Sequence, residues 1–323
     1  MRDDFTPSGQ QRPLNWQELR RQEPLPADTR EVPERQQLAW PDLSVVRYFE
    51  KRIVRKRDRE AMPLVQMGFR PPWLAGTFKP TAAPRLVRPR LMHRSIGVDP
   101  LVVWGADDRR PYDDLNYPWG CVCRVISARR GSGVLIGPRH VLTASHCIDW
   151  NTAAATVEVN RFRTRVSATA QAIAVWSFTE ITGEPGATTV DEDYAVIVLD
   201  QRLGDRFGWM GVRTYDSSWD DEDLWRNIGY PSDIASGLEP TYQRDKELDE
   251  DEWDYGSGRA MTTAADVKKG QSGGPMFAFW DDGPYVVAVV SAEGNIFASG
   301  TENWCSGGSD LTSLVSQARA GDP

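Results

Sequence analysis

The stretch KGQSGGP, from Lys269 to Pro275, decides how the rest of the sequence is interpreted, and the apolar run MFAFW (276–280) follows it. It places a serine between glycines at the start of what reads as a buried strand. Glycine has no Cβ, so it allows a sharp turn and lets another backbone come close. Such a turn leaves the amides of Gly270 and Ser272 free to stabilise a developing oxyanion. We therefore expect Ser272 to be a nucleophile, and an ordinary glycine-rich hairpin is the alternative.

The order of the histidines limits the folds in which such a serine could act. Residues 270–274 match the G-x-S-x-G pattern of α/β-hydrolases, whose histidine follows the serine. The three histidines of this chain, His93, His140 and His146, all precede Ser272, which excludes that fold. A histidine and then an acid upstream of the serine are typical of the chymotrypsin-like order.

Residues 131–147 contain the best candidate for a general base. They predict two strands joined by a Gly-Pro turn, and His146 directly follows the second strand. A base in that place is anchored by the strand while its ring still reaches a cleft. His140 lies in the turn and is expected at the surface, and His93 lies outside the predicted β domain.

An acid that comes just before a buried strand can point inward and orient the imidazole. Asp193 precedes the apolar run 194–199 and is our candidate, with Asp191 as the alternative.

Three blocks of the sequence together resemble the signature blocks of trypsin-like serine proteases, and they occur in the same order. They are TASHC (143–147), DYAVI (193–197) and GQSGGP (270–275). The resemblance extends toward bacterial glutamyl endopeptidases through WGADDR (104–109), YPW (117–119) and IGYP (228–231). It covers about residues 102–320 and implies an all-β fold of two six-stranded antiparallel β-barrels, with the active site between them.

The resemblance also implies a role for each matching residue. Ser272 would be the nucleophile, His146 the base and Asp193 the residue that orients it, with an acyl-enzyme intermediate. The amides of Gly270 and Ser272 would form the oxyanion hole. Ser291 would lie beside Asp193.

Substrate binding is expected on both walls of the cleft. Ser291, Glu293 and Gly294 would line it, and residues 292–294 would pair with an extended substrate backbone. Glutamyl endopeptidases carry a histidine in the strand that matches 289–292, and this chain has none there. Asp266, six residues before the serine, and Glu293 on the opposite wall would favour Lys or Arg at the cleavage site.

The sequence divides near residue 100. Residues 1–100 carry a net charge of +7 and 13 of the 22 prolines, whereas residues 101–323 carry −15. We expect residues 1–101 to be a basic, mostly irregular region and 102–323 to be the protease domain. Gln271 stands where trypsin-like zymogens usually have the aspartate that receives a new N-terminal ammonium. Activation must therefore differ, and we predict that residues 1 to about 101 are removed as a pro-segment.

Within the first region, residues 44–61 predict a basic helix. We interpret its charges as a solvated face, or as a surface that docks on the acidic domain. Nucleic-acid binding is the weaker interpretation and is not adopted.

The second region predicts many short strands, which favour a barrel or sandwich, and a terminal amphipathic helix over 310–319. The strands are expected at 121–128, 133–136, 141–144, 155–159, 167–175, 194–199, 225–229, 241–246, 259–263, 276–280 and 285–291.

The four cysteines predict disulfide bonds. Cys121 and Cys123 lie two apart on one strand face, so they are not expected to pair with each other. The trypsin-like resemblance implies a bridge from Cys147, whose usual partner near Gly131 is missing. We expect Cys147 to pair with Cys121 or Cys123, and Cys305 with the other or with none. A Cys-x-Cys zinc site is the rival interpretation.

Bridges would imply an oxidising compartment, so we predict an exported protein, although the sequence opens without a secretory signal. No apolar stretch approaches the ~18 residues of a membrane span. No cofactor and no metal are predicted. The sequence thus favours a serine endopeptidase acting on proteins or peptides. A protease without a processing step is one alternative. A catalytically silent module that docks partners through its basic N-terminal region is the other.

Overall fold

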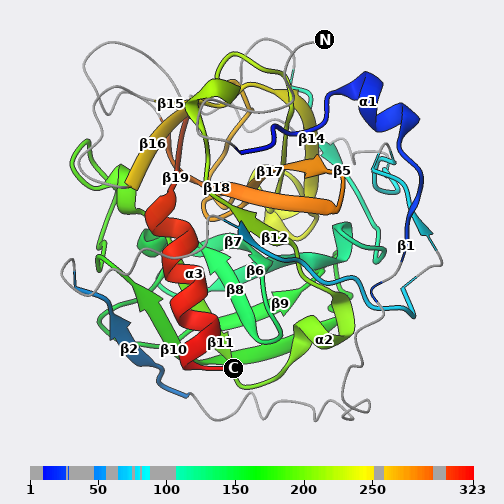
Figure 1. The fold of residues 1–323 in the computed structure, drawn as a ribbon. Coiled ribbons are helices and arrows are strands. Elements are labelled where there is room, and N and C mark those ends of the chain that lie inside the picture. The colour runs from blue at the N-terminus through cyan, green and yellow to red at the C-terminus, as the bar shows by residue number, and fades with distance from the viewer. Residues whose placement is uncertain are drawn as a thin grey trace.

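A computed structural model describes residues 10–26, 28, 47–55, 65–74, 77–80, 82–87, 107–250, 258–293 and 303–323. Two curled β-sheets lie one above the other, and one helix runs alongside both (Figure 1). The helices are α1 (Trp16–Arg21), α2 (Leu203–Phe207) and α3 (Ser309–Gly321). The strands are β1 (Leu25–Pro26), β2 (Glu50–Ile53), β3 (Val65–Gln66), β4 (Thr77–Phe78), β5 (Arg110–Pro111), β6 (Val122–Ile126), β7 (Arg130–Leu135), β8 (His140–Thr143), β9 (Thr156–Val159), β10 (Ala168–Ser177), β11 (Ala195–Leu199), β12 (Gly211–Arg213), β13 (Trp225–Gly229), β14 (Thr241–Lys246), β15 (Asp249–Glu250), β16 (Gly258–Thr263), β17 (Pro275–Trp280), β18 (Gly283–Glu293) and β19 (Asn303–Gly308).

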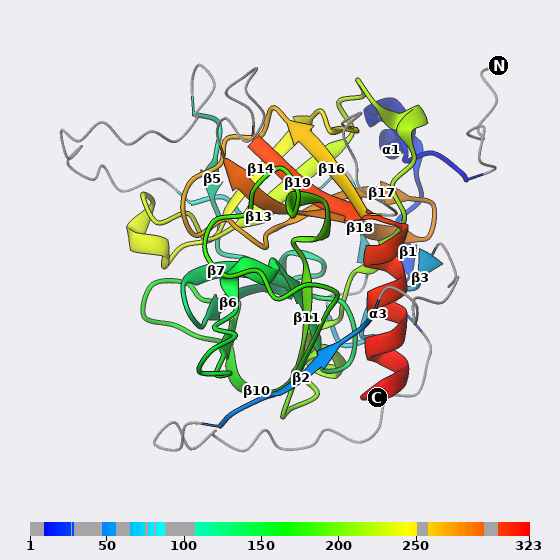
Figure 2. The same ribbon diagram turned by 90° about the vertical axis from the view of Figure 1, so that its left-hand side faces the viewer.

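The first sheet closes into a barrel. Its strands follow the order β11-β8-β7-β6-β9-β10, and β10 pairs antiparallel with β11 to complete the ring. Figure 2 shows this ring in the lower half of the molecule. Inward side chains such as Leu135, Val141 and Ile197, which are cross-strand neighbours on one face, are fully buried, because a barrel of this size is filled by its own side chains.

The second sheet is curled and has ten strands. Its path runs β15-β16-β19-β18-β17-β13-β14-β5, with β12 attached to β18 and β3 to β12. Its core holds a cluster of aromatic rings that includes Trp219, Trp225 and Trp280. The predicted all-β, chymotrypsin-like architecture is confirmed, although short strands extend the second sheet beyond the six expected.

Every strand predicted between residues 121 and 291 occurs in the structure with slightly shifted ends. Strand β19 was missed because its sequence, NWCSGG, is rich in glycine and serine, which are poor strand formers. It nevertheless pairs along its length with β16 and β18, so tertiary pairing outweighs propensity here.

His140 is not a surface residue. It begins β8, is fully buried, and its Nε2 lies 3.2 Å from the carbonyl oxygen of Ala318 in α3. The predicted terminal helix is present as α3, which packs against both sheets (Figure 1). None of the helices in the described ranges has the length and apolarity needed to cross a membrane.

The basic helix predicted over 44–61 is wrong where the structure describes that segment. Residues 50–53 form β2, which pairs in parallel with β10; residues 44–46 and 56–61 lie outside the described residues. Phe49 and Val54 flank the strand and are buried. Pairing with an existing sheet therefore decides the conformation, not the helical spacing of charges.

The described N-terminal segments are packed against the rest of the molecule. The Leu14 amide donates to the Phe279 carbonyl at 2.8 Å, and Trp280 Nε1 donates to the Gln11 carbonyl at 2.8 Å. Leu19 and Phe78 are buried in the same apolar cluster as the first barrel. Ion pairs also join basic residues of the N-terminal segments to acidic residues after residue 102. The pairs are Arg47–Asp200, Lys51–Glu180, Arg52–Asp322 and Arg85–Asp113. Such partly exposed pairs contribute little to stability, so apolar burial is the larger effect.

Candidate active site

The imidazole of His146 is fixed against a buried carboxylate. His146 lies in a short 3-10 helix, η3 (Ser145–Cys147), directly after β8. Its Nδ1 is 2.6 Å from Asp193 Oδ2, and its amide donates to Asp193 Oδ1 at 2.9 Å. Ser291 Oγ donates to the same carboxylate at 2.5 Å. The structure thus brings Asp193 to the imidazole, whereas Asp191 lies within η4 (Val190–Glu192), beside Gly258.

The two groups shift each other's ionisation. Burial opposes the charged imidazole, but the Asp193 carboxylate outweighs it and raises the pKa of His146 well above 6.5. Burial likewise opposes the carboxylate, but His146 and the Ser291 hydroxyl lower the pKa of Asp193. Opposite charges in close contact stabilise each other's charged forms. The pair is therefore suited to hold a proton on the imidazole.

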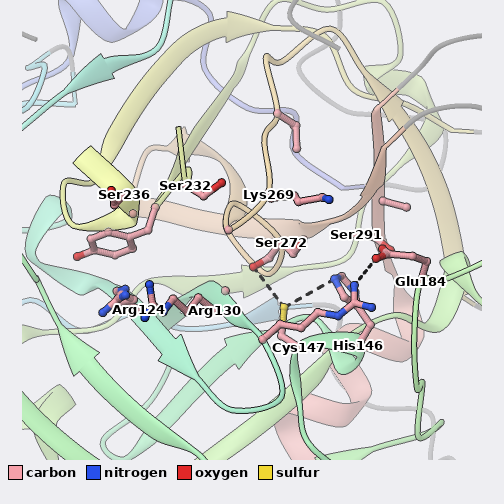
Figure 3. Close-up of a pocket in the computed structure, with 17 residues that line it drawn as sticks. Arg124, Arg130, His146, Cys147, Glu184, Ser232, Ser236, Lys269, Ser272 and Ser291 are labelled. Carbon is pink, nitrogen blue, oxygen red and sulfur yellow. Dashed lines mark hydrogen bonds and ion pairs between the residues drawn. The ribbon is translucent and has the colours of Figure 1, made fainter. Parts of the chain in front are cut away.

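Ser272 faces the same cavity as His146. The cavity has a volume of about 520 Å³ and lies between the two sheets (Figure 3). The Ser272 side chain is partly exposed. His146 Nε2 lies 3.8 Å from the thiol of Cys147, and within the described residues no hydrogen bond joins it to Ser272. Catalytic hydrogen bonds commonly tighten only when substrate is bound.

The turn before Ser272 is shaped for an anion. Gly270 has φ +94°, and a Cβ there would lie 2.5 Å from the Tyr230 carbonyl oxygen, so only glycine fits. In the described part of the chain, the amides of Gly270 and Ser272 donate to no other group. Two such amides beside a serine hydroxyl can bind a developing oxyanion.

Comparison with known proteins agrees with this geometry. Residues 131–289 match the family model described as a trypsin-like peptidase domain. The chain contains a trypsin-like peptidase domain. A solved structure of a Glu endopeptidase in complex with MPD is similar, with a TM-score of 0.56 and 20% sequence identity, covering 68% of this chain and 100% of that one. No curated protein matches the chain in sequence. The predicted resemblance to trypsin-like proteases is confirmed, and the fold is that of the Glu endopeptidase.

The predicted substrate-binding residues of the peptidase domain fall in different places. Ser291 lines the cavity, together with Ala292. Glu293 ends β18 opposite Asn303, and Gly294 lies outside the described residues. Asp266 is 1% exposed and accepts a hydrogen bond from the Asp108 amide at 3.1 Å. Because this carboxylate is buried away from the cavity, it gives no support to a preference for Lys or Arg.

Cations dominate the charged lining of the cavity. Among the residues that the structure describes, Arg124, Arg129, Arg130 and Lys269 line it, against one carboxylate, Glu184. Arg124 is paired with Glu158 at 2.9 Å, and Arg129 is paired with Glu184. Arg130 and Lys269 are exposed and make no ion pair with another described residue. In Figure 3, Arg124, Ser232 and Ser236 lie on one side of Ser272, and Ser291 and Glu184 on the other.

The predicted disulfides are wrong, because all four cysteines are buried free thiols. The Cys121 thiol donates to the Phe207 carbonyl of α2 and the Cys123 thiol to the Cys121 carbonyl, and burial raises the pKa of both. Cys305 lies in β19 of the other sheet. Cys147 Sγ lies 2.6 Å from where a Cβ at Gly131 would be, so the usual partner position is occupied by a glycine. Free thiols give no reason to expect an oxidising compartment, so export of the protein stays a prediction without this support.

Sequence reasoning missed Ser132, which joins the two sheets at the site. Its hydroxyl donates to the Gly270 carbonyl at 2.7 Å and accepts from the Tyr230 amide at 2.8 Å. Its own amide donates to the Ser272 carbonyl at 2.7 Å. The available signal was a serine flanked by two glycines inside a strand, which marks a close approach of another backbone.

Proposed function

We propose that this protein is a serine endopeptidase with His146, Asp193 and Ser272 as its catalytic triad. One observation carries the proposal: the His146–Asp193 pair, with Nδ1 2.6 Å from the carboxylate, faces the cavity that Ser272 also lines. The free amides of Gly270 and Ser272 beside the hydroxyl support it. The trypsin-like peptidase match supports the same reaction class.

In the proposed reaction, Ser272 Oγ attacks the scissile carbonyl carbon while His146 Nε2 takes the hydroxyl proton. The Gly270 and Ser272 amides bind the oxyanion of the tetrahedral intermediate. As the C–N bond breaks, His146 donates its proton to the leaving amine and an acyl ester remains on Ser272. Water, deprotonated by His146, then attacks the ester; as the ester bond breaks, His146 returns that proton to Ser272 Oγ and the acid is released. Asp193 holds the tautomer that leaves Nε2 free to accept.

Active-site labelling tests the proposal. A fluorophosphonate probe should label the wild-type chain once, and peptide mapping should place the label on Ser272. The S272A variant should not be labelled, whereas S313A, which changes a buried serine of α3, should be labelled like wild type. Correctly folded wild-type protein that resists labelling would instead support the catalytically silent docking module.

We further propose that substrates carry acidic side chains near the scissile bond. The exposed cations Arg130 and Lys269 lie at the cavity, whereas the buried Asp266 does not reach it. The similarity in fold to a Glu endopeptidase supports this direction. A peptide library should show cleavage beside Asp or Glu, and preferred cleavage after Lys or Arg would contradict the proposal.

Removal of residues 1 to about 101 stays a prediction. The described contacts of that region support the opposite proposal, that it remains part of the working enzyme. Its segments belong to the apolar cluster that extends through both sheets, and they pair with β10 and β12. N-terminal sequencing of the active protein distinguishes the two.

A further inference from the structure

A buried amide side chain occupies the position just before the candidate nucleophile. Gln271 is fully buried, and all four of its hydrogen-bonding positions are used. Its Oε1 accepts from the Lys268 amide at 2.8 Å and from Arg109 Nη1 at 3.2 Å. Its Nε2 donates to Asn227 Oδ1 at 3.1 Å and to the Asp266 carbonyl at 3.2 Å. Gln271 thereby fixes the turn that carries the Gly270 and Ser272 amides.

The cation that meets Gln271 comes from far away in the sequence. The Arg109 side chain is 1% exposed, and each of its five N–H groups has an acceptor. Nε and Nη2 donate to the Asp107 carboxylate at 3.0 and 2.8 Å. Nη1 and Nη2 donate to Asp233 at 2.9 and 2.6 Å, and Nη1 also reaches Gln271. The guanidinium is therefore held in one orientation.

Contacts around Arg109 join three segments of the chain: the segment before β5, the loop after β13 and the turn before Ser272. Asp233 belongs to the loop after β13, and the neighbouring Ser232 amide donates to the Lys269 carbonyl at 2.6 Å. The Asp108 amide donates to the Asp266 carboxylate at 3.1 Å, on the other side of the turn. Lys246 pairs with Asp108 at 2.8 Å. Arg109 contacts both the Asp233 loop and Gln271, so it links these segments to the turn.

We propose that Arg109 is a positioning residue, an internal cation that holds the turn from Lys268 to Ser272 in its anion-binding shape without any freed amino terminus. This inference rests on the proposed peptidase activity. Arg109 touches no reacting atom, and it acts through Gln271 and through the Asp233 loop. The chain is then competent before any cleavage.

Substitution of Arg109 tests the proposal. Asp107 and Asp233 are 41% and 37% exposed, so water can solvate both carboxylates in R109A. We expect kcat for a peptide substrate to fall about 100-fold, the loss typical of one oxyanion donor, while KM stays within about 3-fold. The affinity for a peptide aldehyde, which needs the oxyanion hole, should fall by a factor similar to that of kcat. R109K should show a smaller loss, and methylguanidine should partly restore R109A.

The matched control is R110A, which removes the adjacent, exposed arginine and should behave like wild type. If R109A does not fold, R109K becomes the test variant, because lysine keeps the positive charge but lacks the planar guanidinium and its five donors. A wild-type kcat and wild-type aldehyde affinity in a folded Arg109 variant would overturn the proposal. A loss confined to KM would overturn it as well.

A second experiment tests the competence of the uncut chain. Full-length protein carrying an N-terminal fusion, with the intact mass verified, should react with the fluorophosphonate at the wild-type rate. Reaction that begins only after cleavage would overturn the role of Arg109. Absence of reaction before and after cleavage would instead overturn the proposed peptidase function, so the two failures are distinguishable.

Discussion

At the scale of single residues, Asp193 accepts hydrogen bonds from the ring and the amide of His146, and from Ser291. These contacts fix both the orientation and the charge of the imidazole. A general base acts in its neutral form, so the activity of the wild type should be lost as the pH falls through the raised pKa of His146.

Replacing the carboxylate should reverse that effect. D193N removes the carboxylate that raises the pKa of the imidazole, while burial, which lowers that pKa, remains, so the acid limb of kcat/KM should move to lower pH. We expect kcat to fall by about 10⁴-fold, because the amide can stabilise the wrong tautomer. The pH dependence of kcat/KM with a fixed peptide substrate measures both. An acid limb that stays in place would contradict the assigned pair.

Cys147 and Gly131 give a prediction that does not depend on activity. A Cβ at residue 131 would lie 3.2 Å from Cys147 Cβ, against about 3.8 Å in an average disulfide. A small shift should let G131C form a bridge, which would leave three free thiols of five. Closing a loop of about 15 residues should raise the free energy of unfolding by about 3 kcal/mol. Five thiols counted under denaturing, oxidised conditions would show that the two positions are not adjacent.

The sequence could predict the candidate catalytic residues because they lie in short local motifs. The histidine after a strand, the acid before a strand and the serine between glycines each have a local physical reason. Arg109 and Ser132 could not be predicted in this way, since their roles depend on contacts with residues 124 and 138 positions away. The cysteine pairing failed for the same reason, because spacing says nothing about which sulfurs meet.

At the scale of secondary-structure elements, the junction of β8 and α3 contains a buried histidine. Burial lowers the pKa of His140 to about 4, against 6.5 when exposed, with a further contribution from Arg319. The His140 imidazole is therefore protonated more readily in the unfolded chain than in the folded one. Stability is lost as the pH falls from about 6.5 to 4, by up to about 3 kcal/mol.

H140Q should remove that dependence, because glutamine can still donate to the Ala318 carbonyl but does not titrate. Urea unfolding at pH 7 and pH 4.5 should show a smaller difference for H140Q than for wild type. A drop between the two pH values equal to that of wild type would show that other groups cause the acid sensitivity.

Elements, unlike distant contacts, were largely predictable between residues 121 and 291, because alternating apolar residues and turn residues mark the strands. Within that range only short elements such as β12 and β15 were missed. Outside it, the two failures have physical causes. β2 carries exposed charged side chains and owes its conformation to pairing with β10. β19 carries glycines that only the neighbouring strands order.

At the scale of the whole molecule, residues before 102 complete both sheets. Leu19, Phe49, Phe69 and Phe78 are buried in one cluster with the first barrel. Burying one such side chain contributes about 1.5–3 kcal/mol, and the whole free energy of unfolding of a protein is about 5–15 kcal/mol. The composition boundary near residue 100 therefore does not coincide with a boundary in packing.

Expressing residues 102–323 alone should give a chain that does not fold stably. Circular dichroism and urea unfolding measure this directly. Protein cut after residue 101 once folded, with both fragments kept together, should retain its structure and serves as the control. A truncated chain with the unfolding midpoint of the full-length protein would show that these contacts are dispensable.

The contact between Arg109 and Gln271 bears on how such an enzyme could be restrained. If an internal arginine orders the oxyanion-binding turn, the protease has no inactive zymogen that proteolytic cleavage would activate. Its host would have to limit damage by other means, through an inhibitor, through confinement or through scarcity of the protein itself.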